Sequence, residues 1–244
     1  MKTKLLTIAM TAALMFTAMT KVQAQNFDGP CLPPAHGLVD HQSAFCSAMQ
    51  VIALASGWNW VSTYVAITMD DLKDAIVAAY PSAGMNALSI KSKDDGQSNY
   101  NPVAHRWISG PSTIHLEQMY MVKVPSDGTI TLEGMPINPA ELSITVTPGI
   151  NWIAFPLSTE MTLSEAFAGF PAQGDNISSY DDGQANWNSG ANRWIGTLNN
   201  NNLKPGKGYI YNSKATQNKT LVFPSGSSKA APAPTKLHIY PLGE

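Results

Sequence analysis

An internal duplication is the feature that most constrains how this chain can fold. Three segments return in the same order: 57–61 (GWNWV) at 149–153 (GINWI), 94–97 (DDGQ) at 181–184 (DDGQ), and 106–108 (RWI) at 193–195 (RWI). The offset is 92 residues for the first pair and 87 for the other two, so small insertions fall between the segments. Because loops tolerate insertions better than packed elements do, we expect two copies of one module.

The first residues read as a signal peptide. Lys2 and Lys4 precede an apolar run, and residues 22–24 (VQA) have the small-x-small pattern of a signal peptidase site. The apolar run is shorter than the about 20 residues that a membrane span needs. We therefore expect removal of residues 1–24 and an exported mature chain, without a membrane span, in the extracellular space, on the cell surface or in the periplasm. The alternative is an uncleaved anchor.

The charge balance argues against a nucleic-acid partner. The chain has 15 Lys and Arg against 17 Asp and Glu; without the leader's Lys2, Lys4 and Lys21, 12 basic residues remain and the formal charge is −5. Nucleic-acid binding depends on neutralising phosphates with Lys and Arg. A surface with only 13% charged residues instead suits an extracellular β-rich protein.

Cys31 and Cys46 both precede the first copy. In an oxidising compartment such a pair is expected to form a local disulfide, which would stabilise the fold by about 3 kcal/mol in the chain-entropy model. We therefore predict a disulfide-stapled N-terminal segment over residues 25–49. The alternative, a reactive or metal-binding thiol pair, lacks a C-x-x-C spacing and a convincing set of histidine ligands.

Each copy reads as a small α+β unit. Alternating apolar residues predict a strand before Gly57 and before Gly149, and the Trp-containing segment after each glycine predicts a second strand. Helical spacing follows in both copies, with Thr68 or Thr162 as the N-cap. Asp-Gly pairs then predict hairpin turns.

The predicted fold class is therefore α+β, with two tandem homologous β-rich modules of about six strands and one short helix each. The modules are placed at residues 50–135 and 142–224, and an Ala/Pro/Ser linker and tail at 225–244.

The order G-W-N-W, short helix, D-x-G, R-W-I-G and P-G-K-G-Y resembles tandem repeat modules in exported and cell-surface proteins of Gram-negative bacteria. The second copy fits best, with RWIG at 193–196 and LKPGKGY at 203–209. In the first copy Ser109 replaces the glycine, and 116–120 (LEQMY) lacks the Pro-Gly-Lys-Gly turn. The resemblance implies surface location and modularity, without an activity.

The tail carries a second resemblance. Residues 236–241 (KLHIYP) are similar to the opening strand of the C-terminal sorting domains of the type IX secretion route, with Leu242 where asparagine would be expected. This segment is interpreted as a remnant of such a sorting domain or as an ordinary tail.

Residues that catalyse reactions or bind metals show no recognisable grouping. None of the five histidines has a duplicated partner: His36, His41, His105, His115 and His238. Metal-binding, serine-nucleophile and phosphate-loop motifs are absent from the sequence. We therefore predict a non-enzyme without metal, cofactor or catalytic residue. The duplicated acids are interpreted as turn residues; the alternative is a calcium site at Asp181 and Asp182 with nearby asparagines.

The aromatic residues supply the candidate binding site. Trp60, Trp107, Trp152 and Trp194 recur in register beside apolar residues and are expected in the core. Tyr100 and Trp187 are expected to be partly exposed, and an aromatic face with flanking amides can bind a sugar. The predicted ligand-binding residues are Tyr100, Asn99 and Asn101 in the first copy and Trp187, Asn186 and Asn188 in the second.

These observations predict a secreted or cell-surface, non-catalytic binding or adhesion protein whose partner is a surface glycan or a protein. One alternative is a glycan-binding accessory module that uses aromatic platforms. A second, from a different class, is a hydrolase with a site between the modules.

Overall fold

The computed structural model describes residues 47–224. The predicted signal peptide, Cys31, Cys46 and the tail at 225–244 lie outside the described residues. Strands account for 39% of the described residues and helices for 11%, and every sheet is antiparallel. None of the helices within 47–224 has the length and apolar character needed to cross a membrane.

The predicted α+β class is therefore wrong, and the fold is β-rich. Helix α1 (Met69–Ala79) is the only helix of seven or more residues in the described part of the chain. Helix α2 (Leu163–Ala166) stops after four residues. It stops because Gly169 soon takes a left-handed φ of +69° and Pro171 cannot continue a helix.

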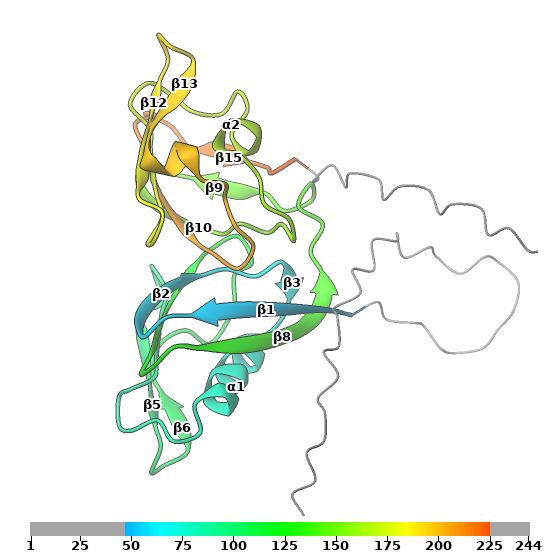
Figure 1. The fold of residues 1–244 in the computed structure, drawn as a ribbon, viewed down its shortest axis with the longest axis vertical. Coiled ribbons are helices and arrows are strands. Elements are labelled where there is room, and N and C mark those ends of the chain that lie inside the picture. The colour runs from blue at the N-terminus through cyan, green and yellow to red at the C-terminus, as the bar shows by residue number, and fades with distance from the viewer. Residues whose placement is uncertain (1–46, 225–244) are drawn as a thin grey trace, which may run out of the picture. The chain divides into compact units, whose positions relative to one another are not determined.

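The first module contains two sheets and α1. Five strands form one sheet in the order β2 (Gly57–Val61), β7 (Tyr120–Val124), β4 (Ser89–Lys91), β5 (Gln97–Asn101) and β6 (Arg106–Ile108). The second sheet has the order β1 (Ala48–Leu54), β8 (Gly128–Pro136) and β3 (Val65–Ala66). Helix α1 lies alongside β8 (Figure 1).

The second module has a five-stranded sheet with the matching order. Its strands are β10 (Gly149–Ile153), β14 (Tyr209–Ser213), β11 (Asn176–Ser178), β12 (Gln184–Asn188) and β13 (Arg193–Gly196). Strand β15 (Lys219–Leu221) pairs with β9 (Ile144–Val146), and a 3-10 helix, η1, covers Thr197–Asn200. The first module has eight strands and the second has seven, so both exceed the predicted six.

Each module has its own core. The first core joins buried residues from both of its sheets and from the helix, including Ile52, Ile76 and Ile90. The second core is more aromatic and includes Phe155, Phe167, Trp194, Tyr211 and Phe223.

An asparagine builds the same corner in both modules. The Asn59 side chain accepts a hydrogen bond from the Ala55 N–H (2.9 Å) and donates one to the Ala55 carbonyl (2.8 Å). Asn151 makes the same two bonds with Thr147, at 2.9 and 2.7 Å. The glycine two residues before each asparagine has a φ near +90° (+95° and +88°), which side chains disfavour. The Gly-x-Asn sequence thus turns the chain from β1 into β2 and from β9 into β10.

Candidate functional site

Tyr100 and Trp187 lie on the core-facing side of their sheets. Tyr100 is directly opposite Trp107 in the β5–β6 pair, and the two ring centroids are 5.5 Å apart. Trp187 is opposite Trp194 in the β12–β13 pair, also at 5.5 Å. Both rings are half-buried and pack against the cores. Packing of this kind leaves little of either ring free to stack on a ligand.

The flanking asparagines point the other way, because successive side chains of a strand alternate between its two faces. Asn101 accepts hydrogen bonds from the Val103 and Ala104 N–H groups (2.9 and 3.0 Å). Asn188 accepts one from Ala191 N–H (2.9 Å). These two side chains therefore hold hairpin turns. The structure does not bring the predicted rings and amides together on one face.

Asn186 instead belongs to a row of five side chains across the outer face of the second sheet. Strand register places Ile150, Asn212, Asn176, Asn186 and Ile195 side by side in that order. The two isoleucines at its ends are 49% and 44% exposed, and Asn176 donates a hydrogen bond to Asn186 (3.0 Å). We call these five residues the second outer row. Only Asn186 was predicted as a site residue.

The first sheet carries a corresponding row that contains Asn99. Its members, in order, are Trp58, Lys123, Ser89, Asn99 and Ile108. Ile108 is 40% exposed, whereas Ser89 is buried and its hydroxyl donates to the Asn99 side chain (2.7 Å). We call these residues the first outer row. Lys123 gives this row a positive charge where the second row has Asn212.

Two tryptophans predicted to be core residues also lie on the outer faces. Trp60 and Trp152 follow Trp58 and Ile150 by two positions, so strand alternation places each pair on one face. Both are half-buried. The Trp60 ring packs on Tyr180 of the second module, with centroids 5.6 Å apart.

The duplicated acids have structural partners in the second module. Lys204 pairs with Asp182 (2.9 Å) and Lys207 pairs with Asp181 (2.7 Å). The hydrogen bond to Asp182 raises the pKa of Lys204. The lysines of the Lys-Pro-Gly-Lys segment therefore hold the Asp-Asp-Gly turn. Within residues 47–224, no three His, Cys, Asp or Glu side chains gather as a possible metal-binding group.

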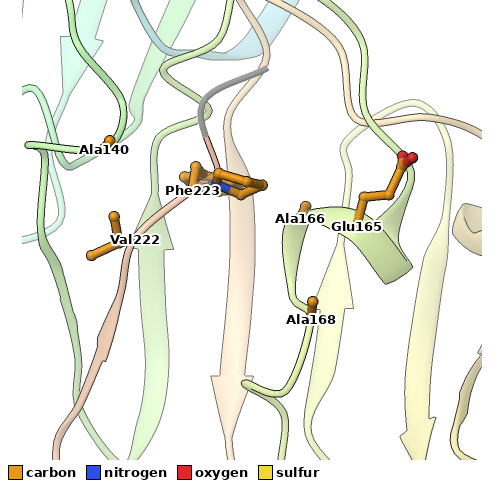
Figure 2. Close-up of a pocket in the computed structure, with 7 residues that line it drawn as sticks. Ala140, Glu165, Ala166, Ala168, Val222 and Phe223 are labelled. Carbon is orange, nitrogen blue, oxygen red and sulfur yellow. The ribbon is translucent and has the colours of Figure 1, made fainter. Parts of the chain in front are cut away.

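A shallow pocket of about 320 Å³ lies in the second module (Figure 2). Its lining is mostly apolar: Ala140, Ala166, Ala168, Val222, Phe223, Pro224 and the single carboxylate of Glu165. The Glu165 carboxylate points away from Phe223 (Figure 2) and accepts hydrogen bonds from the Thr162 N–H and hydroxyl (3.1 and 2.7 Å). These bonds lower the pKa of Glu165. Glu165 therefore serves as part of the cap of α2.

No family model, no curated protein and no solved structure matches this chain.

Proposed function

We propose that this chain is an exported, non-catalytic binding protein and that it binds its partner through the two outer rows. The observation that carries this proposal is the exposure of isoleucines on the outer sheet faces. Ile108 and Ile195 occupy matching places in the two rows and are 40% and 44% exposed. Single exposed apolar residues are common on protein surfaces, but here one recurs at the same place in both copies beside polar side chains, and this recurrence supports an interaction site.

A glycan is the partner that best fits the composition of the rows. Amide side chains both donate and accept hydrogen bonds, as sugar hydroxyls require. Asn176, Asn186 and Asn212 present such groups on three neighbouring strands, at a strand spacing of about 4.8 Å. Trp58 adds an aromatic side chain in the first row. A surface protein is the alternative partner.

The hydrolase alternative has weaker support. Glycoside hydrolysis usually needs two carboxyl groups on either side of the scissile bond. Glu165 is the one carboxylate that lines the pocket in Figure 2, and the N-cap of α2 engages it. This pocket, which lies in the second module, therefore lacks the pair of carboxyl groups that glycoside hydrolysis uses.

Retention of the mature protein, residues 25–244, on a glycan array and on intact bacterial cells tests the proposal. Ile195→Lys places a charge at the end of the second row and is expected to weaken retention about tenfold or more. Val103→Lys is the matched control, because Val103 is 81% exposed in the β5–β6 turn and lies outside both rows. Circular dichroism establishes that both variants fold.

Full retention of the parent and of Val103→Lys, with weakened retention of Ile195→Lys, would support the outer rows as the binding site. A parent protein that binds no glycan and no cell, or an Ile195→Lys variant that binds as the parent does, would contradict the proposal.

A further inference from the structure

The two modules belong to one compact unit and contact each other through the same positions in both directions. The Ser62 N–H donates to the Gly206 carbonyl (3.1 Å), and the Ala154 N–H donates to the Glu117 carbonyl (3.1 Å). Ser62 and Ala154 each lie two residues after the tryptophan that ends the GxNW segment, so they are equivalent positions. Exchanging the modules therefore converts one of these hydrogen bonds into the other.

The equivalence of Glu117 and Gly206 rests on a shared tyrosine contact. The Tyr120 hydroxyl accepts a hydrogen bond from the N–H five residues earlier, at His115 (2.7 Å). The Tyr209 hydroxyl accepts one from the N–H five residues earlier, at Lys204 (2.8 Å). Glu117 and Gly206 each lie two residues after that donor. The two loops before β7 and β14 are thus the same structural element.

Met119 and Gly208 immediately precede these tyrosines and are equivalent as well. A Cβ atom added to Gly208 would collide with the Met119 side chain, which is fully buried. Equivalent residues of two modules contact each other where a rotation axis passes close to them, and the two reciprocal hydrogen bonds make this axis twofold. A methionine on one side and a glycine on the other allow the two backbones to approach closely.

Further hydrogen bonds hold the same contact. The Gly208 N–H donates to the Trp60 carbonyl (3.0 Å), so the loop pairs with the end of β2. The buried Ser62 hydroxyl donates to the Lys207 carbonyl (2.6 Å) and accepts from the Phe155 N–H (3.1 Å). The contact therefore combines main-chain hydrogen bonds and small residues with the Met119 side chain and the Trp60–Tyr180 ring pair.

We infer that the modules are joined by an isologous interface with a pseudo-twofold axis between Met119 and Gly208. The partner that fits this surface is another copy of the module, and in this chain the sister module occupies it. An isologous contact closes after two members, whereas a head-to-tail contact can continue into a longer array. The chain is therefore a closed pair, and a third module cannot join it through the same contact. This inference is independent of the proposed ligand.

The first test cuts the mature chain between its modules. A protease site placed at residues 138–141, where three of the four residues are exposed, allows cleavage between β8 and β9. The two fragments are expected to elute together in size-exclusion chromatography as a one-to-one complex. Fragments that separate although each retains its circular dichroism spectrum would overturn the inference.

A residue exchange across the axis tests its twofold character. Gly208→Met alone places two methionines at the axis, and overpacking is expected to raise the Kd of the cut fragments about tenfold or more. Adding Met119→Gly restores one methionine and one glycine and is expected to return the Kd to near the parent value. An unchanged Kd for Gly208→Met, or no recovery in the double variant, would overturn the inference.

Two serine variants provide a milder test that avoids steric clashes. Ser62 and Ser98 are both buried, and their equivalents in the second module are Ala154 and Ala185. The Ser98 hydroxyl bonds within its own module, to the Ile108 carbonyl (3.3 Å). Ser62→Ala is expected to raise the fragment Kd about tenfold, because it removes the bonds across the interface. Ser98→Ala is expected to leave it unchanged. Equal Kd values for the two variants would contradict the assigned interface.

Discussion

At the residue scale, Trp194 anchors the core of the second module. It is 1% exposed, and its ring lies 5.7 Å from Phe167 and 5.5 Å from Trp187. Trp194→Ala is expected to lower the free energy of unfolding by about 3–5 kcal/mol, because it empties this site. The indole N–H has no acceptor among the described residues, so Trp194→Phe removes an unsatisfied donor and is expected to cost clearly less. Urea melts that give equal losses for the two variants would contradict this account.

Trp187 is expected to contribute less to stability than Trp194 and more than an ordinary surface residue. Its ring is half-buried on Trp194, so Trp187→Ala is expected to cost about 1–3 kcal/mol, more than an ordinary surface substitution and less than Trp194→Ala. The same urea melts measure this cost. A loss as large as that of Trp194→Ala would show that Trp187 is a core residue.

Strand register explains why the half-buried rings of Tyr100 and Trp187, which were expected to be partly exposed, lie on the core-facing side of their sheets. Asparagines surround both residues in the sequence, which favours a polar environment when each strand is considered alone. However, each ring is paired across the hairpin with a buried or half-buried tryptophan, and directly opposite residues share a face. Pairing the Arg-Trp-Ile strand with the strand before it would have predicted this placement from the sequence.

At the element scale, the start of α1 depends on a capping box. The Thr68 hydroxyl accepts from the Asp71 N–H (3.2 Å), and the Asp71 carboxylate accepts from the Thr68 N–H (2.8 Å) and hydroxyl (2.7 Å). Thr68→Ala is expected to lower the free energy of unfolding by about 1 kcal/mol at neutral pH. Denaturant melts measure the loss. Asp70→Asn is the control, because Asp70 is in the same turn but outside the box.

The capping box also makes the stability difference between the parent and Thr68→Ala depend on pH. Its hydrogen bonds lower the pKa of Asp71 below the value of an unfolded chain. The stabilisation is therefore present above the unfolded pKa and is lost as the pH falls through the folded pKa. The gap between the parent and Thr68→Ala is expected to narrow as the pH falls from about 5 to about 2. A gap that stays constant would contradict this role of Asp71.

Turn signals predicted elements better than helical spacing did. The Asp-Gly hairpins are present, with Gly96 and Gly183 at φ of +77° and +83° between paired strands. The expected second helix is only four residues long, although Thr162 caps it as predicted. A few helically spaced apolar residues do not specify how far a helix continues. That length depends on where the next glycine and proline redirect the chain.

At the scale of the whole molecule, buried tyrosines in both modules are expected to cause unfolding in alkali. Burial raises the pKa of Tyr120 to about 12, and burial also raises the pKa of Tyr209 and Tyr211. Because their folded pKa values exceed those of the unfolded chain, the stabilisation is complete below about pH 10 and is lost as the pH rises further. Tyrosinate absorbance and circular dichroism, followed from pH 9 upward, are expected to show these residues ionising together with unfolding. Full ionisation of all tyrosines before any loss of circular dichroism would contradict this link between tyrosine ionisation and unfolding.

The contact between the modules was not predictable from one module considered alone. The Pro-Gly-Lys-Gly segment occurs only in the second copy, and its sequence by itself indicates a turn. Its second glycine is required because Met119 of the other module occupies the space that a side chain would fill. A small residue whose size is determined by a distant partner has no local sequence signature.

The closed pair also predicts how binding depends on ligand density. Each module presents one outer row, and linking two weak sites raises avidity by about 10²–10⁴ when both can bind one surface. Ile108→Lys and Ile195→Lys alter equivalent positions, so each is expected to remove the avidity gain while leaving the other row's affinity for a soluble ligand unchanged. Biosensor measurements on densely and sparsely coated surfaces separate the two quantities. The avidity gain disappears when geometry prevents both rows from binding at the same time. The same apparent Kd for the parent at both densities would therefore show that the two rows do not bind one surface together.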